Sequence, residues 1–336
     1  MTRIVFSFSM NKMSLEEKIS QLFIITTEQL PSFSIDIETS VPEPGGVILF
    51  KNDLLDLKEL KKRLSLFSHK QGIYPFISID EEGGRVSKIR GVVPGYDLKS
   101  PFSYKADGES AAKEHAKYVS GHLKRLGINT VFAPVADVWS NKSNTVIADR
   151  AYSDDFWEAS LLVNAAVRGF KEEGMICCLK HWPGHGDTNE DSHKEVARLK
   201  KPLQKLKEEE FLPFRTGIEG GADMVMTSHV VAENIDDVPA SLSKRCIDIL
   251  REDYNYKGLI ITDSLQMRGA SQFFDEDLLS LKAFIAGNDI ALMPTDYGAS
   301  LAIVIDAVKE GIITEDDINE KLSRVLSVKE AHGLVR

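Results

Sequence analysis

The chain has 336 residues, 43% of them hydrophobic and 27% charged, which is an ordinary composition for a globular protein. Its formal net charge is −10. Basic blocks and interleaved aromatic residues are absent, which argues against a surface for nucleic acid or for an anionic membrane. No run approaches the roughly 18 apolar residues that a membrane span requires. We therefore expect a small-molecule partner, no nucleic acid and no membrane.

The three cysteines, Cys177, Cys178 and Cys246, are too few for a disulfide framework and too poorly spaced for a four-cysteine zinc site. They indicate a reducing compartment, and we expect the protein in the cytoplasm. Residues 1–12 show no signal-peptide pattern. Because Ser14 followed by two glutamates is typical of a helix N-cap and its first turn, we expect the folded domain at 13–336 and treat 1–12 as an extension outside it.

Apolar runs that follow Gly or Pro predict eight buried strands, separated by segments with helical periodicity. Most of these runs are continuously apolar and rich in Val and Ile, as in a parallel sheet that is covered on both faces. The predicted strands are 22–26, 46–50, 75–80, 130–137, 175–181, 223–229, 259–263 and 289–294. The predicted helices are 54–69, 108–126, 154–173, 203–219, 244–254 and 277–286, followed by 298–308 and 315–331.

Eight strand-then-helix units in one chain predict an α/β fold, the (β/α)8 TIM-type barrel, as a single domain. The alternative is an open, doubly wound sheet. That fold would need a Gly-rich nucleotide-binding turn after the first strand, and none is present.

Five of the predicted strands end in charged or titratable side chains. Because the carboxyl ends of the strands in a barrel meet at one face, we expect these side chains to surround a pocket. Asp263, where a buried strand meets a loop, is the strongest candidate for a nucleophile. The full set is Asp80, Asp137, Lys180 with His181, His229 and Asp263.

The segment 179–195, LKHWPGHGDTNEDSHKE, combines histidine, carboxylate and lysine side chains more closely than any other part of the chain. It follows one of the predicted strands. Histidines beside carboxylates can transfer protons near neutral pH or bind a metal. As a loop that leaves the carboxyl end of a buried strand, the segment lies where parallel α/β folds place their active sites.

Four segments together resemble glycoside hydrolase family 3. They are KHWPGHGDTNEDSH at 180–193, IDEEGGRV at 79–86, ADRAY at 148–152 and ITDSLQM at 261–267. The resemblance runs from about Met13 to the C-terminus and is closest to the single-barrel β-N-acetylglucosaminidase branch. It implies a glycosidase that needs no cofactor and no metal.

The resemblance also implies roles for single residues. Asp263 matches the retaining nucleophile, and His193 matches the general acid/base. Asp191 matches the partner that fixes the tautomer of His193 and raises its basicity. The residues expected to bind the sugar are Asp80, Lys88, Arg150, Lys180 and His181, to which we add the strand-end residue His229. Lys88 stands where the branch carries Arg and lacks its bidentate fork, while Ser264 and Trp182 replace an Asp and a Phe.

Each assignment has a plainer alternative. Asp263 would otherwise be a helix N-cap, and Asp191 with His193 a solvated surface pair. Asp80 and Arg150 would form a salt bridge at the rim. Lys180 and His181 would only stabilise neighbouring carboxylates, and His229 would be a hydrogen-bonded structural residue. We further expect His185 and Asp187 to shape their loop, and Cys177 and Cys178 to be core residues. Asp137 is expected either to be structural or to support a site residue without touching the substrate.

The leading functional hypothesis is a retaining exo-β-N-acetylglucosaminidase that acts on peptidoglycan fragments or related glycosides, as a monomer or weak homodimer. A phosphorylase or a β-glucosidase with the same site is the first alternative. A metal-dependent hydrolase is another, with ligands drawn from His181, His185, Asp187, Asp191, His193 and His229. The last is a sugar-binding barrel without activity.

Overall fold

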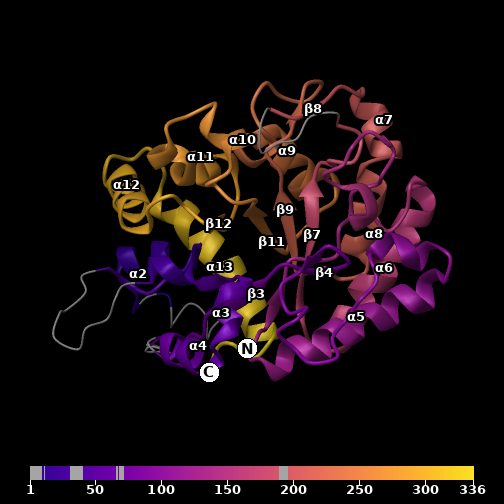
Figure 1. Cartoon of the computed structure of the whole chain (residues 1–336). Helices are drawn as coiled ribbons and strands as arrows, with labels where there is room; N and C mark the ends of the chain where they lie inside the picture. The colour runs from indigo at the N-terminus through magenta and orange to yellow at the C-terminus, as the bar shows by residue number, and fades with distance from the viewer. Residues whose placement is uncertain (1–9, 11, 31–40, 66, 68–71, 189–195) are drawn as a thin grey trace.

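The computed structural model describes residues 10, 12–30, 41–65, 67, 72–188 and 196–336. Within them, eight strands form one sheet in the order β11-β9-β7-β6-β3-β2-β1-β12, and every neighbouring pair is parallel. The outer two strands meet through a parallel bridge between Ile261 and Ile290, which closes the sheet. Helices surround the strands (Figure 1). The (β/α)8 barrel is confirmed, and the doubly wound alternative is wrong.

The barrel strands are β1 (Phe23–Thr26), β2 (Gly46–Leu49), β3 (Phe76–Ile79), β6 (Thr130–Val131), β7 (Ile176–Trp182), β9 (Met224–Thr227), β11 (Leu259–Thr262) and β12 (Ala291–Leu292). Two short pairs lie outside the barrel: β4 (Glu81–Gly83) with β5 (Val86–Ser87), and β8 (Arg198–Leu199) with β10 (Val231–Ala232). The helices are α2 (Leu15–Ser20), α3 (Lys51–Leu55), α4 (Leu57–Leu64), α5 (Gly108–Arg125), α6 (Phe156–Glu172), α7 (Leu203–Glu208), α8 (Phe211–Glu219), α9 (Lys244–Asp248), α10 (Arg268–Ser271), α11 (Leu279–Ala286), α12 (Tyr297–Lys309) and α13 (Glu315–Ala331).

Several predicted elements are shorter or divided. The predicted helix 54–69 is replaced by α3 and α4, because Asp56 between them caps α4 by accepting the N–H groups of Lys58 and Glu59. The predicted helix 203–219 is divided into α7 and α8, since Pro213 is tolerated only in a first helical turn. The predicted strand 130–137 is regular only over β6, because Pro134, beyond its end, provides no N–H for a ladder.

The remaining differences are small. The segment 244–254 is an α-helix only over α9 and continues as a π-helical turn, Ile249–Asp253. The segment 289–294 pairs as a strand only over β12. The other predicted helices agree with α5, α6, α11, α12 and α13 to within about two residues, which is the usual variation at helix ends.

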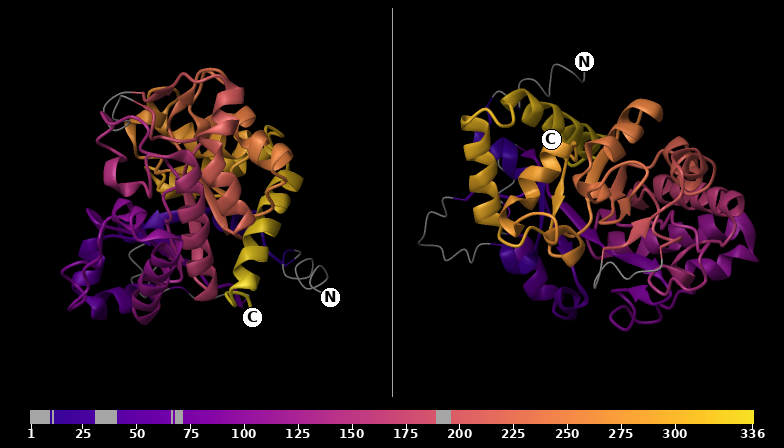
Figure 2. Two further views of the ribbon diagram at one scale, coloured as in Figure 1. Left: turned by 90° about the vertical axis from the view of Figure 1, so that its right-hand side faces the viewer. Right: turned by 90° about the horizontal axis from the view of Figure 1, so that it is seen from above.

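The two ends of the described chain are held together. α2 lies beside α12 and α13 in Figure 1 and in both views of Figure 2. Ser14 caps α2 in a capping box with Glu17, as its sequence predicts. Lys18 of α2 forms an ion pair of 2.7 Å with Glu315 of α13. The first described helix therefore packs against the last two.

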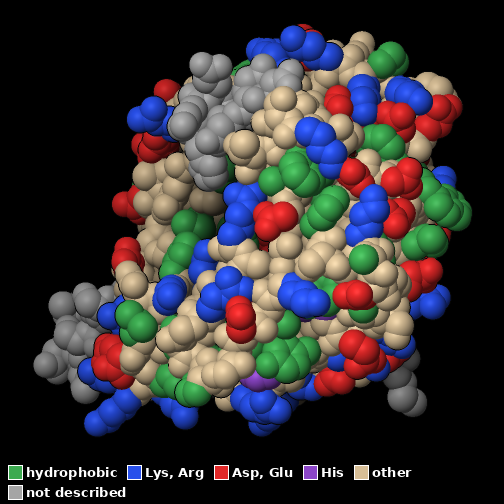
Figure 3. All heavy atoms as spheres, turned by 45° about the vertical axis from the view of Figure 1, so that its right-hand side comes forward, with side chains coloured by type: hydrophobic (Ala, Val, Ile, Leu, Met, Phe, Trp, Pro, Cys, Tyr) green, Lys and Arg blue, Asp and Glu red, His purple; other side chains and the backbone are tan. Residues whose placement is uncertain are grey.

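No helix in the described part of the chain is both long and apolar enough to cross a bilayer. On the face drawn in Figure 3, Lys and Arg side chains are interspersed with Asp and Glu.

Lys329 of α13 is fully buried near the amino-terminal ends of the barrel strands. Its Nζ donates to Gln21 Oε1 at 2.8 Å and to the Gly45 carbonyl at 2.9 Å, and it lies 4.8 Å from the centre of the Phe76 ring. No carboxylate among the described residues forms an ion pair with it. Burial without a counter-charge lowers the pKa of Lys329 to about 7.

We expect Lys329→Met to remove a pH dependence of stability. In the unfolded chain a lysine has a pKa of about 10.4, so between about pH 7 and 10 the unfolded state binds more protons and wild-type stability rises with pH. The variant should fold, because Phe76 N–H still donates to the Gly45 carbonyl.

We therefore compare the free energies of unfolding of Lys329→Met and wild type. The advantage of Lys329→Met over wild type should shrink by about 3 kcal/mol between pH 7 and pH 10. Denaturant titrations at the two pH values measure this difference. The exposed Lys257→Met variant is the control and should follow wild type at both. Parallel pH dependences of Lys329→Met and wild type would contradict a charge-burial cost at this position.

Candidate active site

The carboxyl ends of β3 and β7 are joined by a buried lysine. Lys180 of β7 places its Nζ 2.6 Å from Asp80 Oδ1 and 2.6 Å from Glu82 Oε1, and its side chain is only 3% exposed. Burial alone would lower the pKa of Lys180, but the two carboxylates raise it above its usual value. The ammonium is therefore charged at any physiological pH.

Arg150, at the end of the 3-10 turn Ala148–Arg150, is held by the same glutamate. Its Nε and Nη2 lie 2.8 and 2.9 Å from the two oxygens of Glu82, which makes a bidentate pair. Its Nη2 also lies 3.4 Å from His181 Nε2. The alternative in which Arg150 forms its salt bridge with Asp80 is wrong, since the partner is Glu82.

His181 is oriented by Asp137, a fully buried carboxylate in the segment that follows the neighbouring strand β6. Asp137 Oδ2 lies 2.6 Å from His181 Nδ1 and accepts the His181 N–H at 3.2 Å, while its Oδ1 accepts the His185 N–H at 2.7 Å. Burial would raise the pKa of Asp137, but the two histidines lower it. Because an ionised Asp137 only accepts hydrogen bonds, we assign the proton of a neutral His181 to Nδ1, which leaves Nε2 to accept from Arg150. Of the two roles expected for Asp137, these contacts favour support of a site residue, because Asp137 sets the tautomer of His181.

Asp263 follows β11 and is fixed through its backbone. Its N–H donates to Thr227 O at 2.8 Å, and its Oδ1 accepts the Ser264 N–H at 2.7 Å. Burial would raise its pKa, but His181, His229, the Ser264 N–H and Lys180 together lower it. The next helix, α10, begins at Arg268 with Met267 as its N-cap. The alternative role of Asp263 as a helix N-cap is therefore wrong.

His229 supports the same strand end. Its Nδ1 lies 2.8 Å from Ser241 Oγ, and its Nε2 lies 2.8 Å from the carbonyl of Ser264. Since a carbonyl only accepts, Nε2 carries a proton and donates it to Ser264. These two bonds make His229 a hydrogen-bonded residue that holds the chain next to Asp263, and they agree with its structural alternative.

The PGHG turn brings the histidine-rich segment against the chain that follows β6. A Cβ added at Gly186 would lie 1.6 Å from the Val138 carbonyl, so only glycine allows this approach. His185 is buried, and its Nδ1 lies 3.0 Å from Thr188 Oγ1. Asn144 donates to the carbonyls of His185 and Thr188 at 2.7 and 3.1 Å. His185 thus shapes the loop, as expected, while Asp191 and His193 lie outside the described residues.

Asp187 lies at the same turn. Its Oδ1 accepts from Ser140 Oγ at 3.2 Å and lies 3.5 Å from Lys201 Nζ. These contacts tie the turn to neighbouring segments, which agrees with the loop-shaping role expected for Asp187.

Lys88 is placed by a second buried glutamate. Glu81 Oε2 accepts the N–H groups of Lys88 and Ile89 at 2.7 and 3.1 Å, and its Oε1 accepts from Tyr96 Oη at 3.1 Å. The ammonium of Lys88 makes no bond to any residue that the structure describes. Its backbone is therefore fixed while its side chain stays available.

Sequence reasoning missed Glu81 and Glu82 as site residues. Both belong to β4, and alternation along this short strand sends their side chains to opposite sides. Glu81 orders the segment that bears Lys88, whereas Glu82 holds two cations. The signal was present in the IDEEGGRV segment, because two adjacent glutamates directly after a buried strand must both find partners if they are buried.

The three cysteines are free and buried, which confirms Cys177 and Cys178 as core residues. Among the described residues, no group of three or more His, Cys, Asp or Glu side chains is arranged to hold a metal ion. The described residues of the metal hypothesis are His181, His185, Asp187 and His229, and they form no such group.

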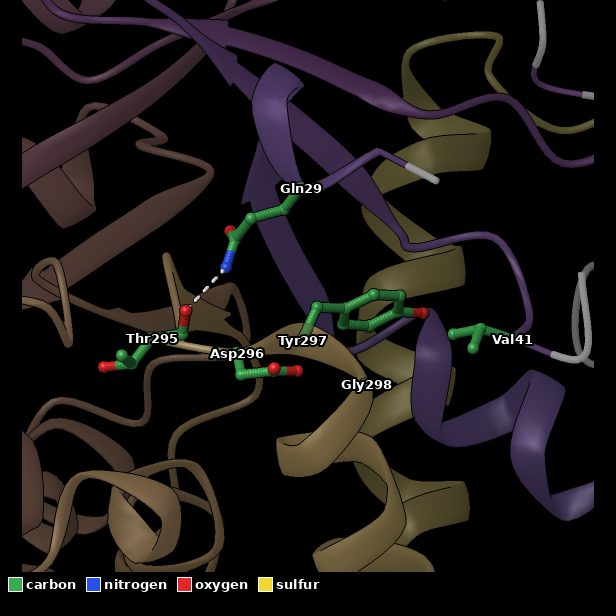
Figure 4. A pocket seen from close by; sticks show the side chains of 6 residues that line it. All are labelled: Gln29, Val41, Thr295, Asp296, Tyr297 and Gly298. Carbon is green, nitrogen blue, oxygen red and sulfur yellow. Dashed lines mark hydrogen bonds between the residues drawn. The ribbon is translucent and has the colours of Figure 1, made fainter. Parts of the chain in front are cut away.

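A small pocket lies at the same end of the barrel, after β1 and β12. It encloses about 250 Å³ and is lined by Gln29, Val41, Thr295, Asp296, Tyr297 and Gly298. Figure 4 shows Gln29 pointing toward the Thr295 carbonyl, 3.2 Å from its Nε2. Asp296 is occupied as the N-cap of α12. None of the predicted site residues lines this pocket, so it neighbours the candidate site without forming it.

Taken together, the strand ends place an anionic carboxylate, Asp263, beside a network of charged hydrogen-bonding groups. Such a network suits a ligand rich in hydroxyl groups. The family model described as the glycosyl hydrolase family 3 N-terminal domain matches residues 14–328. The chain belongs to glycosyl hydrolase family 3. The family inferred from the four sequence segments is thereby confirmed.

Two similar proteins carry related names. Beta-hexosaminidase A of Pseudoalteromonas piscicida is 31% identical over 319 residues, which are 85% of this chain and 53% of that protein. The chain thus spans about half the length of this relative. Beta-hexosaminidase of Idiomarina loihiensis is 29% identical over 299 residues, 88% of this chain and 89% of that protein.

The fold has a close counterpart among solved structures. A family 3 β-N-acetylglucosaminidase from a Paenibacillus species superposes with a TM-score of 0.87 at 30% identity, covering 96% of this chain and 63% of that one. Almost the whole length of the present chain therefore has a counterpart in that structure.

Proposed function

We propose that this family 3 protein is a retaining exo-β-N-acetylglucosaminidase with Asp263 as its nucleophile. The observation that carries the proposal is the state of Asp263. Its pKa is lowered, it directly follows the barrel strand β11, and it forms no ion pair with a described residue. A carboxylate that is ionised, rigid and free of a cation is what attack on an anomeric carbon requires.

In the proposed reaction an oxygen of Asp263 attacks the anomeric carbon while the bond to the aglycone oxygen breaks. His193 gives its proton to the leaving oxygen, and Asp191 orients His193. His193 then takes a proton from water, whose oxygen attacks the anomeric carbon and releases Asp263. The roles of His193 and Asp191 rest on the sequence resemblance.

The proposed sugar site consists of Asp80, Lys180, Arg150 and His181, with Lys88 available at the rim. Their charged donors and acceptors suit sugar hydroxyls. We assign N-acetylglucosamine as the sugar because similar proteins are named beta-hexosaminidase and β-N-acetylglucosaminidase. The proposed natural substrates are peptidoglycan fragments or related glycosides, and the proposed location is the cytoplasm, where thiols such as the three free cysteines stay reduced.

The test is release of p-nitrophenol from its β-N-acetylglucosaminide and its β-glucoside, in phosphate-free buffer with and without a chelator. We expect release from the N-acetylglucosaminide alone, unchanged by the chelator, with free N-acetylglucosamine as the product. Preference for the glucoside would make the protein a β-glucosidase. A sugar 1-phosphate formed only in phosphate buffer would make it a phosphorylase, and loss of activity with the chelator would support the metal-dependent alternative.

A further inference from the structure

We infer that Glu82 is a positioning residue that holds Arg150 and Lys180 in the geometry for sugar binding. The inference rests on the proposed function, and it adds a residue to which neither the sequence pattern nor the family comparison assigns a role.

The contacts converge on one carboxylate. Glu82 Oε1 accepts from Lys180 Nζ at 2.6 Å and from Arg150 Nη2 at 2.9 Å, while Oε2 accepts from Arg150 Nε at 2.8 Å. Three donors from two separate segments, β7 and the turn Ala148–Arg150, thus share one side chain. The planar fork of Arg150 can lie in only one orientation in such a bidentate pair.

Glu82 lies deeper in the protein than the groups expected to contact the sugar. Its side chain is 1% exposed, whereas those of Arg150 and Asp80 are 14% and 27% exposed. A group this deeply buried, with both oxygens already bonded, has no surface left for a substrate. Glu82 therefore acts through Arg150 and Lys180.

The charges explain why the glutamate is needed. Burial would raise the pKa of Glu82, but Arg150 and Lys180 lower it well below its usual range, so it is an anion. If Glu82 lost its charge, Arg150 would lose its bidentate partner, and Lys180 would keep Asp80 as its remaining anionic partner. The two cations would then no longer be held in one fixed arrangement.

Two variants test the inference. Glu82→Gln keeps the shape but places an amide N–H₂ against donors, and we expect kcat/KM for the p-nitrophenyl β-N-acetylglucosaminide to fall roughly 100-fold. Glu82→Asp keeps the charge but is too short for the bidentate pair, and we expect a fall of roughly 10-fold, expressed mainly in KM. In both variants, inhibition by free N-acetylglucosamine should weaken in parallel with KM.

A merely structural role would lower the folded fraction without changing KM or the inhibition constant of N-acetylglucosamine. Arg150→Met supplies a second test: the loss of kcat/KM in Glu82→Gln combined with Arg150→Met should be smaller than the product of the two single losses. Glu233→Gln, which breaks the exposed pair with Arg198, is the matched control and should behave as wild type.

The inference is overturned if folded Glu82→Asp retains the wild-type KM and inhibition constant, or if the two losses multiply. Glu82→Asp decides the question even if Glu82→Gln does not fold. Should the wild type prefer a β-glucoside, the proposed function fails. The same variants are then measured on that glucoside with glucose as inhibitor, so the two failures are distinguishable.

Discussion

Asp263→Asn is expected to lower kcat for the p-nitrophenyl β-N-acetylglucosaminide by a factor on the order of 10⁴, because an amide oxygen is a poor nucleophile. The fold should be retained. Asn has the same shape, and its side-chain oxygen can still accept the Ser264 N–H that Asp263 accepts at 2.7 Å. Steady-state kinetics with matched thermal unfolding curves measure both effects. A folded variant with kcat within ten-fold of wild type would remove Asp263 from the nucleophile role.

Asp263→Ala gives an independent check. It opens space at the same position, where added azide can attack the anomeric carbon in place of the carboxylate. Because azide would approach from the face opposite the leaving group, the product should be the α-glycosyl azide. A β-glycosyl azide, or no rescue by azide in a folded variant, would contradict the geometry proposed for Asp263.

Asp137→Asn is expected to reduce both stability and activity. The buried carboxylate accepts from His181 N–H, His181 Nδ1 and His185 N–H, and an amide would turn a donor toward these donors. We expect a loss of about 2–3 kcal/mol in the free energy of unfolding. Without an anionic acceptor at Nδ1, His181 can adopt the other tautomer and no longer accept from Arg150, so kcat/KM should fall roughly 100-fold. Denaturant titrations and kinetics measure the two losses.

The stability loss in Asp137→Asn should depend on pH in a defined direction. The pKa of Asp137 is lowered in the folded state. The carboxylate therefore contributes stability above its unfolded pKa of about 3.9, and this contribution disappears as the pH falls through the folded pKa. The gap between wild type and Asp137→Asn should narrow below about pH 4. A gap that stays constant down to acid unfolding would show that the charge of Asp137 contributes nothing.

The barrel could be predicted because its strands are continuously apolar and each is followed by a helical segment. The lengths of the elements were harder to predict. Periodicity shows the apolar face of 203–219. It does not show that Pro213 must lie in the first turn of a separate helix. In the same way, it does not show that Asp56 would cap a second helix instead of lying within one.

For the site, polar residues at strand ends were enough to bring Asp80, Lys180 and His181 together, because the barrel itself aligns those ends. Which group pairs with which could not be predicted. That choice depends on side-chain reach across the face, and it assigns Arg150 to Glu82. It also makes His229 a donor to the Ser264 carbonyl.

The most direct test of the account is to trap the covalent intermediate. A 2-acetamido-2-deoxy-5-fluoro-β-glucoside with a good leaving group should form a glycosyl-enzyme faster than water releases it. We predict a mass increase of one fluorinated N-acetylglucosamine on the peptide that contains Asp263, and none in Asp263→Asn. Modification of another residue, or turnover to an α-configured product without any trapped adduct, would contradict a retaining mechanism through Asp263.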